Sequence, residues 1–142
     1  MTPHFCTSRH APDEGVYGDC LRAVVASYFD VEPATVPHFA QLAQGDDTIS
    51  DSIFREYLLR VHNVRPFVVA VDTELPGLLA VQKELNTDIT YLLLCSYGGD
   101  HVVLCRNDKI IHDPASRDGY LRMPDGPLSN GFYVVIVFVE DK

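Results

Sequence analysis

Apolar side chains recur with a helical period in three stretches of the chain, at residues 20–29, 48–62 and 76–85. Asp19 precedes the first stretch and is suited to cap its N-terminus, while Pro76 fits the first turn of the third. We therefore expect three helices. The residues expected to form the buried faces of the first two are Leu21, Val24, Val25 and Tyr28, then Ile53, Phe54, Tyr57, Leu58 and Val61.

Short runs of β-branched and aromatic residues dominate the second half of the chain. A Val-rich run at 65–72 predicts a strand before the third helix. The connections between the middle runs are short, which favours antiparallel pairing. The last run is apolar on both faces, so we expect it to be central in the sheet. The later strands are expected at residues 89–97, 101–106, 109–113 and 132–140.

The order of these elements, helices first and a sheet second, predicts an α+β fold with N-terminal helices packed on a C-terminal antiparallel sheet. Residues 1–18 have little periodicity and are expected to form an irregular arm. Residues 31–38 contain two prolines and are expected to form a loop. Because the chain has 142 residues and no repeat or linker, we expect a single domain, 1–142.

Charge and composition restrict the partners. The net charge is −9 and the 11 Lys and Arg residues form no cluster, which argues against nucleic acid as a partner. No run approaches the roughly 18 apolar residues of a membrane helix, and the N-terminus does not have the pattern of a signal peptide. We therefore expect a cytoplasmic protein without a membrane partner, in which the four cysteines stay reduced.

Three residues far apart in the chain have the side chains that nucleophilic catalysis needs. Cys20 lies at the start of the first expected helix, where the helix dipole favours the nucleophilic thiolate. His101 opens a strand directly after a turn with two glycines, and Asp113 ends the next strand. A thiol, an imidazole and a carboxylate can act as a nucleophile, its base and the group that orients the base.

The hairpin that follows His101 decides which group orients its ring. A two-residue loop would place His112 on the His101 face and turn Asp113 away. A three-residue loop, residues 106–108, would pair His101 with Asp113, and Asn and Asp tolerate the left-handed conformation that such a loop needs. We favour the longer loop, because a carboxylate both accepts the imidazole N–H and stabilises imidazolium. His112 is then expected to be an exposed strand residue.

The sequence Gly-Asp-Cys at 18–20, followed by His-Val-Val at 101–103 and His-Asp-Pro at 112–114, resembles papain-like cysteine peptidases. The closest resemblance is to the double-glycine leader peptidases, which process bacteriocins. The chain is also similar to small phage and bacterial proteins that carry Gly-Asp-Cys-x-Arg-Ala and then Val-Pro-His-Phe, here residues 36–39. We therefore expect a papain-like fold and an origin in a bacterium or a phage-infected cell.

The resemblance implies that Cys20 is the nucleophile, His101 the base and Asp113 the orienting residue. It implies a peptide or protein substrate and no metal or organic cofactor. Deamidation and transacylation use the same three groups and stay open. The family usually binds the oxyanion with an upstream Gln, but residues 1–19 contain neither Gln nor Asn. The second donor could be Tyr17, Ser8, His10 or a backbone amide.

Other functions are compatible with parts of this pattern. A binding protein that retains the fold but acts weakly or not at all could sequester a bacterial or host factor. Cys20, His101 and Asp113 could also bind zinc together with Cys105, although the chain lacks the closely spaced ligand pairs typical of such sites. Cys6 and His10 have metal-like spacing, but two ligands do not make a site. Cys95 and Cys105 lie in apolar strands and are expected in the core.

Overall fold

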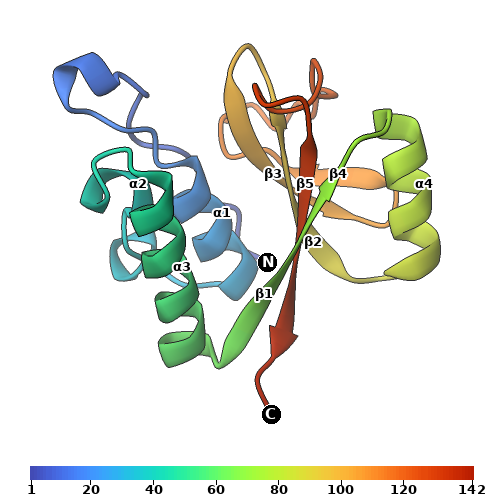
Figure 1. The fold of residues 1–142 in the computed structure, drawn as a ribbon, viewed down its shortest axis with the longest axis horizontal. Coiled ribbons are helices and arrows are strands. Elements are labelled where there is room, and N and C mark those ends of the chain that lie inside the picture. Colours follow the sequence, from blue (N-terminus) through green and yellow to red (C-terminus); the bar gives the residue numbers. More distant parts are fainter. The chain divides into compact units, whose positions relative to one another are not determined.

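The N-terminal part of the chain is mainly helical and the C-terminal part is mainly an antiparallel sheet, which confirms the expected α+β class (Figure 1). The structure is a computed structural model that describes residues 1–142. None of its helices combines the length and apolar character that a membrane crossing requires. The helices are η1 (Pro12–Glu14), α1 (Cys20–Phe29), η2 (Pro33–Thr35), α2 (Phe39–Leu42), α3 (Asp47–His62) and α4 (Leu75–Leu85). The strands are β1 (Val64–Val71), β2 (Thr90–Ser96), β3 (Asp100–Arg106), β4 (Lys109–His112) and β5 (Tyr133–Glu140).

The chain divides into two compact units, one formed by Met1–Pro66 with Val139–Lys142 and the other by Phe67–Phe138. In the first unit α1 is the buried helix, and its residues from Ala23 to Ala26 are almost entirely shielded from water. Asp30 ends α1 in the left-handed conformation at φ 55°.

Aromatic rings join α2 and α3 within the first unit. The ring of Phe39 meets those of Phe54 and Tyr57 edge-on, at centroid distances of 5.4 and 6.0 Å. The expected buried face of α3 is correct for Phe54, Tyr57 and Leu58, but Val61 is 61% exposed. Val61 instead lines an open groove together with Pro37, Ile53 and Arg60.

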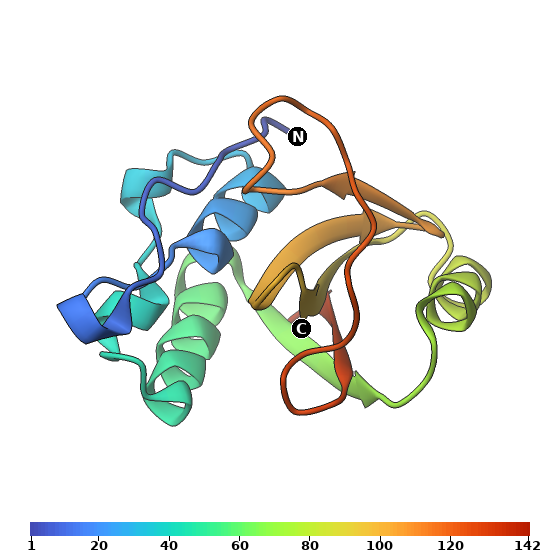
Figure 2. The ribbon, with the colours of Figure 1, turned by 90° about the horizontal axis from the view of Figure 1, so that it is seen from above.

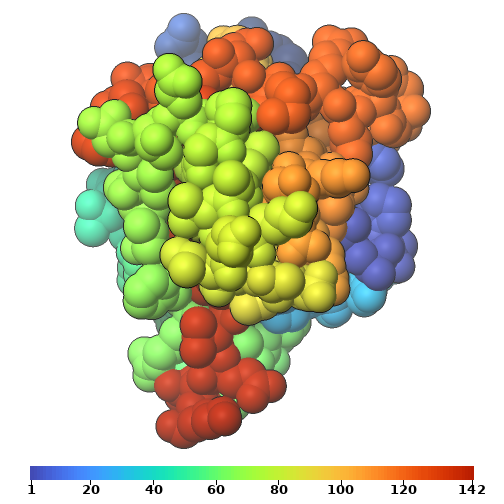
Figure 3. Space-filling view, turned by 90° about the vertical axis from the view of Figure 1, so that its right-hand side faces the viewer, coloured from blue at the N-terminus to red at the C-terminus, as the bar shows by residue number.

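The sheet has the strand order β1-β5-β2-β3-β4, so β2 is the middle strand. β5 was expected at the centre; it is an interior strand but lies one place away. α4 packs on one face of the sheet, as Figure 2 shows from above. Figure 3 shows the outer surface of this helix, in yellow-green. The buried contacts of this core are Leu75, Leu78 and Leu79 of α4, every second residue of the strands (Tyr91, Leu93, Cys95, Val103, Cys105) and Tyr133 and Val135 of β5.

The β3–β4 hairpin differs from the expected three-residue loop. Arg106 pairs with Lys109 and Cys105 with Ile110, so the turn has only two residues. The register then shifts, because Leu104 pairs with His112 and one extra β4 residue bulges out of the ladder. A shift of one residue exchanges the two faces of a strand. The bulge therefore turns His112 away from the His101 face and returns Asp113 to it.

Candidate active site

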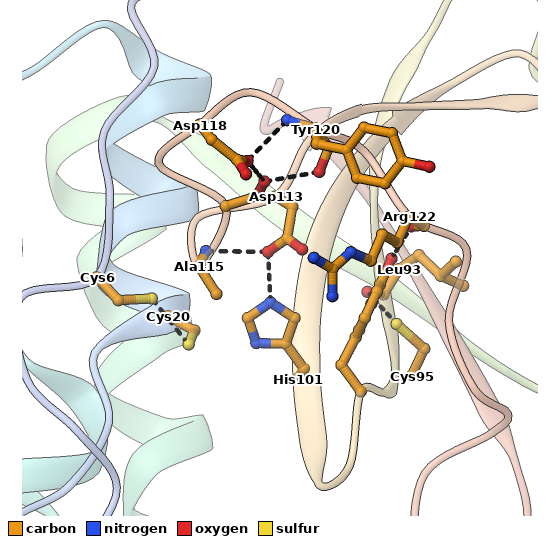
Figure 4. Close-up of polar contacts among 12 residues, drawn as sticks. Cys6, Cys20, Leu93, Cys95, His101, Asp113, Ala115, Asp118, Tyr120 and Arg122 are labelled. Atoms are coloured by element: carbon orange, nitrogen blue, oxygen red, sulfur yellow. Dashed lines mark hydrogen bonds and ion pairs between the residues drawn. The ribbon is translucent and has the colours of Figure 1, made fainter.

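His101 and Asp113 form a direct pair in the second unit. Nε2 of His101 lies 2.7 Å from Oδ1 of Asp113, and each side chain is only 8% exposed (Figure 4). The Ala115 backbone N–H donates to the same carboxylate oxygen at 2.9 Å. The expected contact between His101 and Asp113 is thus confirmed, although the loop that was expected to produce it is wrong. With its proton on Nε2, the ring has Nδ1 as its basic nitrogen.

The surroundings of Asp113 keep it ionised. Burial alone would raise the pKa of this carboxyl group, but the hydrogen bonds from His101 and Ala115 and the neighbouring imidazoles outweigh burial and hold its pKa below the ordinary value. A carboxylate in this position fixes the tautomer of His101 and stabilises the imidazolium that forms when His101 accepts a proton.

Tyr97 supports His101 from another side, and the sequence analysis did not identify it. Its ring meets the imidazole edge-on, with 5.3 Å between the centroids. Its hydroxyl donates to the Arg122 carbonyl at 2.6 Å, which ties the ring to the long segment after β4. Burial raises the pKa of Tyr97, so the phenol stays protonated and acts as a hydrogen-bond donor. Its only sequence signal is an aromatic residue at the end of a strand, just before two glycines.

His112 is buried, with 4% exposure, so the expectation of an exposed strand residue is wrong. The cause is the bulge, which pairs His112 with Leu104 on the face opposite to His101. Cys95 and Cys105 are completely buried in the core beneath α4, as expected. Burial raises the pKa of Cys95 to about 12 and raises that of Cys105 as well, so both thiols stay protonated.

Cys20 is the first residue of α1, as the sequence pattern predicted. Its Sγ atom lies 2.9 Å from Sγ of Cys6, and both residues are half-buried (Figure 4). The two sulfurs are not joined by a disulfide. No sequence signal predicts this contact, because Cys6 lies in an arm without periodicity.

Asp19 holds the N-terminal arm instead of capping α1 with its side chain. It precedes the helix as expected, but its carboxylate makes no cap hydrogen bond. The carboxylate accepts hydrogen bonds from the Thr7 N–H at 2.9 Å, the Thr7 hydroxyl at 2.7 Å and the Ser8 N–H at 3.1 Å. Burial raises the pKa of Asp19, but these three donors outweigh that effect and lower it. Asp19 is therefore the N-cap residue, as expected, but its carboxylate is engaged by donors of the arm and not by the helix amides.

The Val-Pro-His-Phe segment supports the turn before Cys20. The His38 ring donates from Nε2 to the Tyr17 carbonyl at 3.0 Å and accepts from the Gln41 N–H at 3.3 Å. The Gln41 amide accepts from the Tyr17 N–H and donates to the Gly15 carbonyl. These bonds give the segment a structural role before Cys20, and its Pro37 also lines the groove beside α3.

Arg22 fixes the same region from within α1. Its Nε donates to the carbonyls of Pro33 and Val36, at 2.8 and 2.9 Å. The Arg of the Gly-Asp-Cys-x-Arg-Ala sequence therefore links α1 to the segment that leads into Val-Pro-His-Phe. This link was not predictable from the two motifs, because carbonyl acceptors leave no trace in the residue types.

The side chains considered as the second oxyanion donor have other contacts. The Ser8 hydroxyl donates to the Tyr17 carbonyl at 3.0 Å, and His10 Nδ1 accepts from the Gly18 N–H at 3.1 Å. The Tyr17 ring packs against Gly45, where an added Cβ would come within 2.9 Å of it. The amides at the start of α1 point along the helix axis. They are the donors on which an oxyanion site at Cys20 would depend.

Comparisons with protein families, with curated proteins and with solved structures find no match. The function must therefore be inferred from the residues and their contacts alone. Cys20 belongs to the first unit, and the His101–Asp113 pair belongs to the second. The meeting of the thiol with the imidazole, and with it the papain-like relationship, stays a prediction.

Proposed function

We propose that the protein is a papain-like thiol hydrolase that cleaves a peptide or isopeptide bond. The observation that carries this proposal is the buried His101–Asp113 pair, in which an ionised carboxylate orients an imidazole. A histidine held in this way is suited to move protons during acyl transfer. The proposal pairs it with Cys20, a thiol at the N-terminus of a ten-residue helix.

In the proposed reaction, Nδ1 of His101 takes the proton from Cys20. The thiolate attacks the carbonyl carbon of the scissile bond, and the amides at the start of α1 stabilise the oxyanion. The imidazolium then gives its proton to the leaving amine, and a thioester with Cys20 remains. His101 next removes a proton from water, which hydrolyses the thioester and regenerates the thiol. Asp113 stays ionised throughout and holds the ring in position.

A degradation assay tests the proposal without a known substrate. The purified chain is incubated with a complex peptide mixture, and new N-termini are identified by mass spectrometry. Wild type should generate new termini, whereas Cys20→Ala, His101→Ala and a mock preparation should not. Cys95→Ala is the matched control, because it removes a core thiol and should retain cleavage. Cleavage that persists in Cys20→Ala would exclude Cys20 as the nucleophile.

The second candidate is a protein with the same fold that binds a bacterial or host factor with little or no catalysis. The contacts of Ser8 and His10 favour it, because the Ser8 hydroxyl already donates to the Tyr17 carbonyl and His10 Nδ1 already accepts from the Gly18 N–H. A binding protein should give the same peptide pattern as Cys20→Ala. The binding protein should also retain binding to its partner when Cys20 is replaced by Ala. The hydrolase should instead form a thioester at Cys20, which hydroxylamine cleaves to give a detectable hydroxamate of the substrate.

A further inference from the structure

We infer that Cys6 and Cys20 form a reversible disulfide when the protein meets a peroxide. Their Sγ atoms lie 2.9 Å apart, and a covalent disulfide needs about 2.0 Å. The Cys6 thiol donates to the Cys20 sulfur, so the two sulfur atoms already face each other. A small movement of side chains is sufficient for the bond to form.

Two anchors place Cys6 at this position. The His4 N–H donates to the hydroxyl of Ser27 in α1 at 2.8 Å, and Ser27 is completely buried. On the other side of Cys6, Thr7 donates twice to the carboxylate of Asp19. The arm is therefore fixed to α1 before and after Cys6. Because both anchors are buried or half-buried contacts within one unit, the approach of the sulfurs is part of the fold.

The chemistry needs only the two thiols and hydrogen peroxide. The Cys20 thiolate attacks one peroxide oxygen, the O–O bond breaks, and the released hydroxide takes up a proton to become water. Cys20 is now a sulfenic acid. The Cys6 sulfur attacks the sulfur of Cys20, the S–O bond breaks, and the hydroxyl leaves as water with the Cys6 proton. Two thiols have been oxidised, and one peroxide has been reduced to two waters.

The position of Cys20 makes it the first thiol to react. It begins a helix, where the dipole stabilises a thiolate, whereas burial keeps Cys95 and Cys105 protonated. Cys6 then acts as the resolving thiol and protects Cys20 from irreversible oxidation. Loss of hydrolysis on oxidation would follow from the proposed function, but formation of the disulfide does not depend on it.

Trypsin provides a direct test, because Arg9 and Arg22 place the two cysteines in different peptides. The full chain is treated with a several-fold molar excess of hydrogen peroxide, blocked with N-ethylmaleimide and digested without reductant. We expect a species that joins residues 1–9 to residues 10–22, lighter than the sum of the two peptides by two hydrogens. Dithiothreitol should abolish it. In Cys6→Ser the joined species should be absent, and Cys20 should instead advance to the sulfinic acid.

The inference is overturned if peroxide leaves both peptides separately alkylated, or if it produces only disulfides between chains on a non-reducing gel. It is also overturned if Cys6→Ser does not change the oxidation state that Cys20 reaches. All of these outcomes are read from peptide masses or gel mobility, and none requires a measurement of hydrolysis. A disulfide in a protein without hydrolysis would reject the proposed function alone, and hydrolysis without the disulfide would reject this inference alone.

Discussion

Asp113 meets His101 at 2.7 Å although the turn between their strands has only two residues. In a regular two-residue hairpin His112 would share the face of His101. The bulge in β4 exchanges the two positions, so the carboxylate faces the imidazole and His112 enters the interior. The orienting group of the candidate site is thus selected by an irregularity of the sheet.

Substitutions at these neighbouring positions should separate catalysis from stability. Asp113→Ala should reduce the rate of peptide cleavage by roughly 10²–10⁴-fold, because the imidazole loses its tautomer and orientation. His112→Ala should lower the free energy of unfolding by about 1–3 kcal/mol and leave the cleavage rate nearly unchanged. Urea unfolding and a cleavage assay measure the two effects. The opposite pattern would mean that His112 is the orienting residue.

The low pKa of Asp113 makes stability depend on pH. A carboxyl group whose pKa is lower in the folded state stabilises the fold above its unfolded pKa of about 3.9. This contribution is lost as the pH falls through the folded-state pKa. The stability difference between wild type and Asp113→Asn should therefore shrink on acidification from pH 5, as measured by urea unfolding at each pH. The same measurements on Asp72→Asn, at an exposed position, provide the matched control.

Asp19 should be the main anchor of the N-terminal arm. Its carboxylate is 4% exposed and accepts three hydrogen bonds, so Asp19→Ala should destabilise the protein by about 1–3 kcal/mol. The amides of Thr7 and Ser8 should exchange with solvent much faster. Asp13→Ala, at an exposed position in η1, is the matched control and should change neither quantity. Unchanged exchange at Thr7 would contradict the anchor.

The four thiols should fall into two reactivity classes. Iodoacetamide at neutral pH should label Cys6 and Cys20 in the folded protein, because both side chains are only half-buried and the reagent can reach them. Cys95 should remain unlabelled, since its pKa is about 12 and it is completely buried, and Cys105 should behave in the same way. In urea all four should react. Labelling of Cys95 at the same rate as Cys20 would show that the core under α4 is open to solvent.

Regular elements could be predicted from the sequence because periodicity records which side of an element is buried. The helix that begins at Cys20 and the strand that contains His101 both lie where the pattern placed them. The short α2 was not predicted, because its four residues are fewer than the pattern needs. The exposure of Val61 depends on where a neighbouring element ends, which periodicity does not record.

The contacts of the candidate site were only partly predictable. The pairing of His101 with Asp113 followed from chemistry, whereas the bulge that produces it has no mark in the residue types of β4. The N-cap position of Asp19 was predictable, whereas the partners of its carboxylate were not, because a capping carboxylate and an anchoring carboxylate have the same sequence signal. Cys6 lies in an arm without periodicity, so only tertiary structure reveals its contact with Cys20.

The central claim is that the Cys20 thiol and the His101 imidazole act together as a nucleophile and its base. The most direct measurement is the rate of alkylation of Cys20 as a function of pH, read from the tryptic peptide 10–22 in wild type and in His101→Ala. The Cys6→Ser background removes coupling between the two sulfurs. The account predicts that Cys20 is alkylated well below the pH of about 8.5 at which an ordinary thiol ionises, and that His101→Ala moves the profile to higher pH. Profiles that coincide in the two proteins would contradict it.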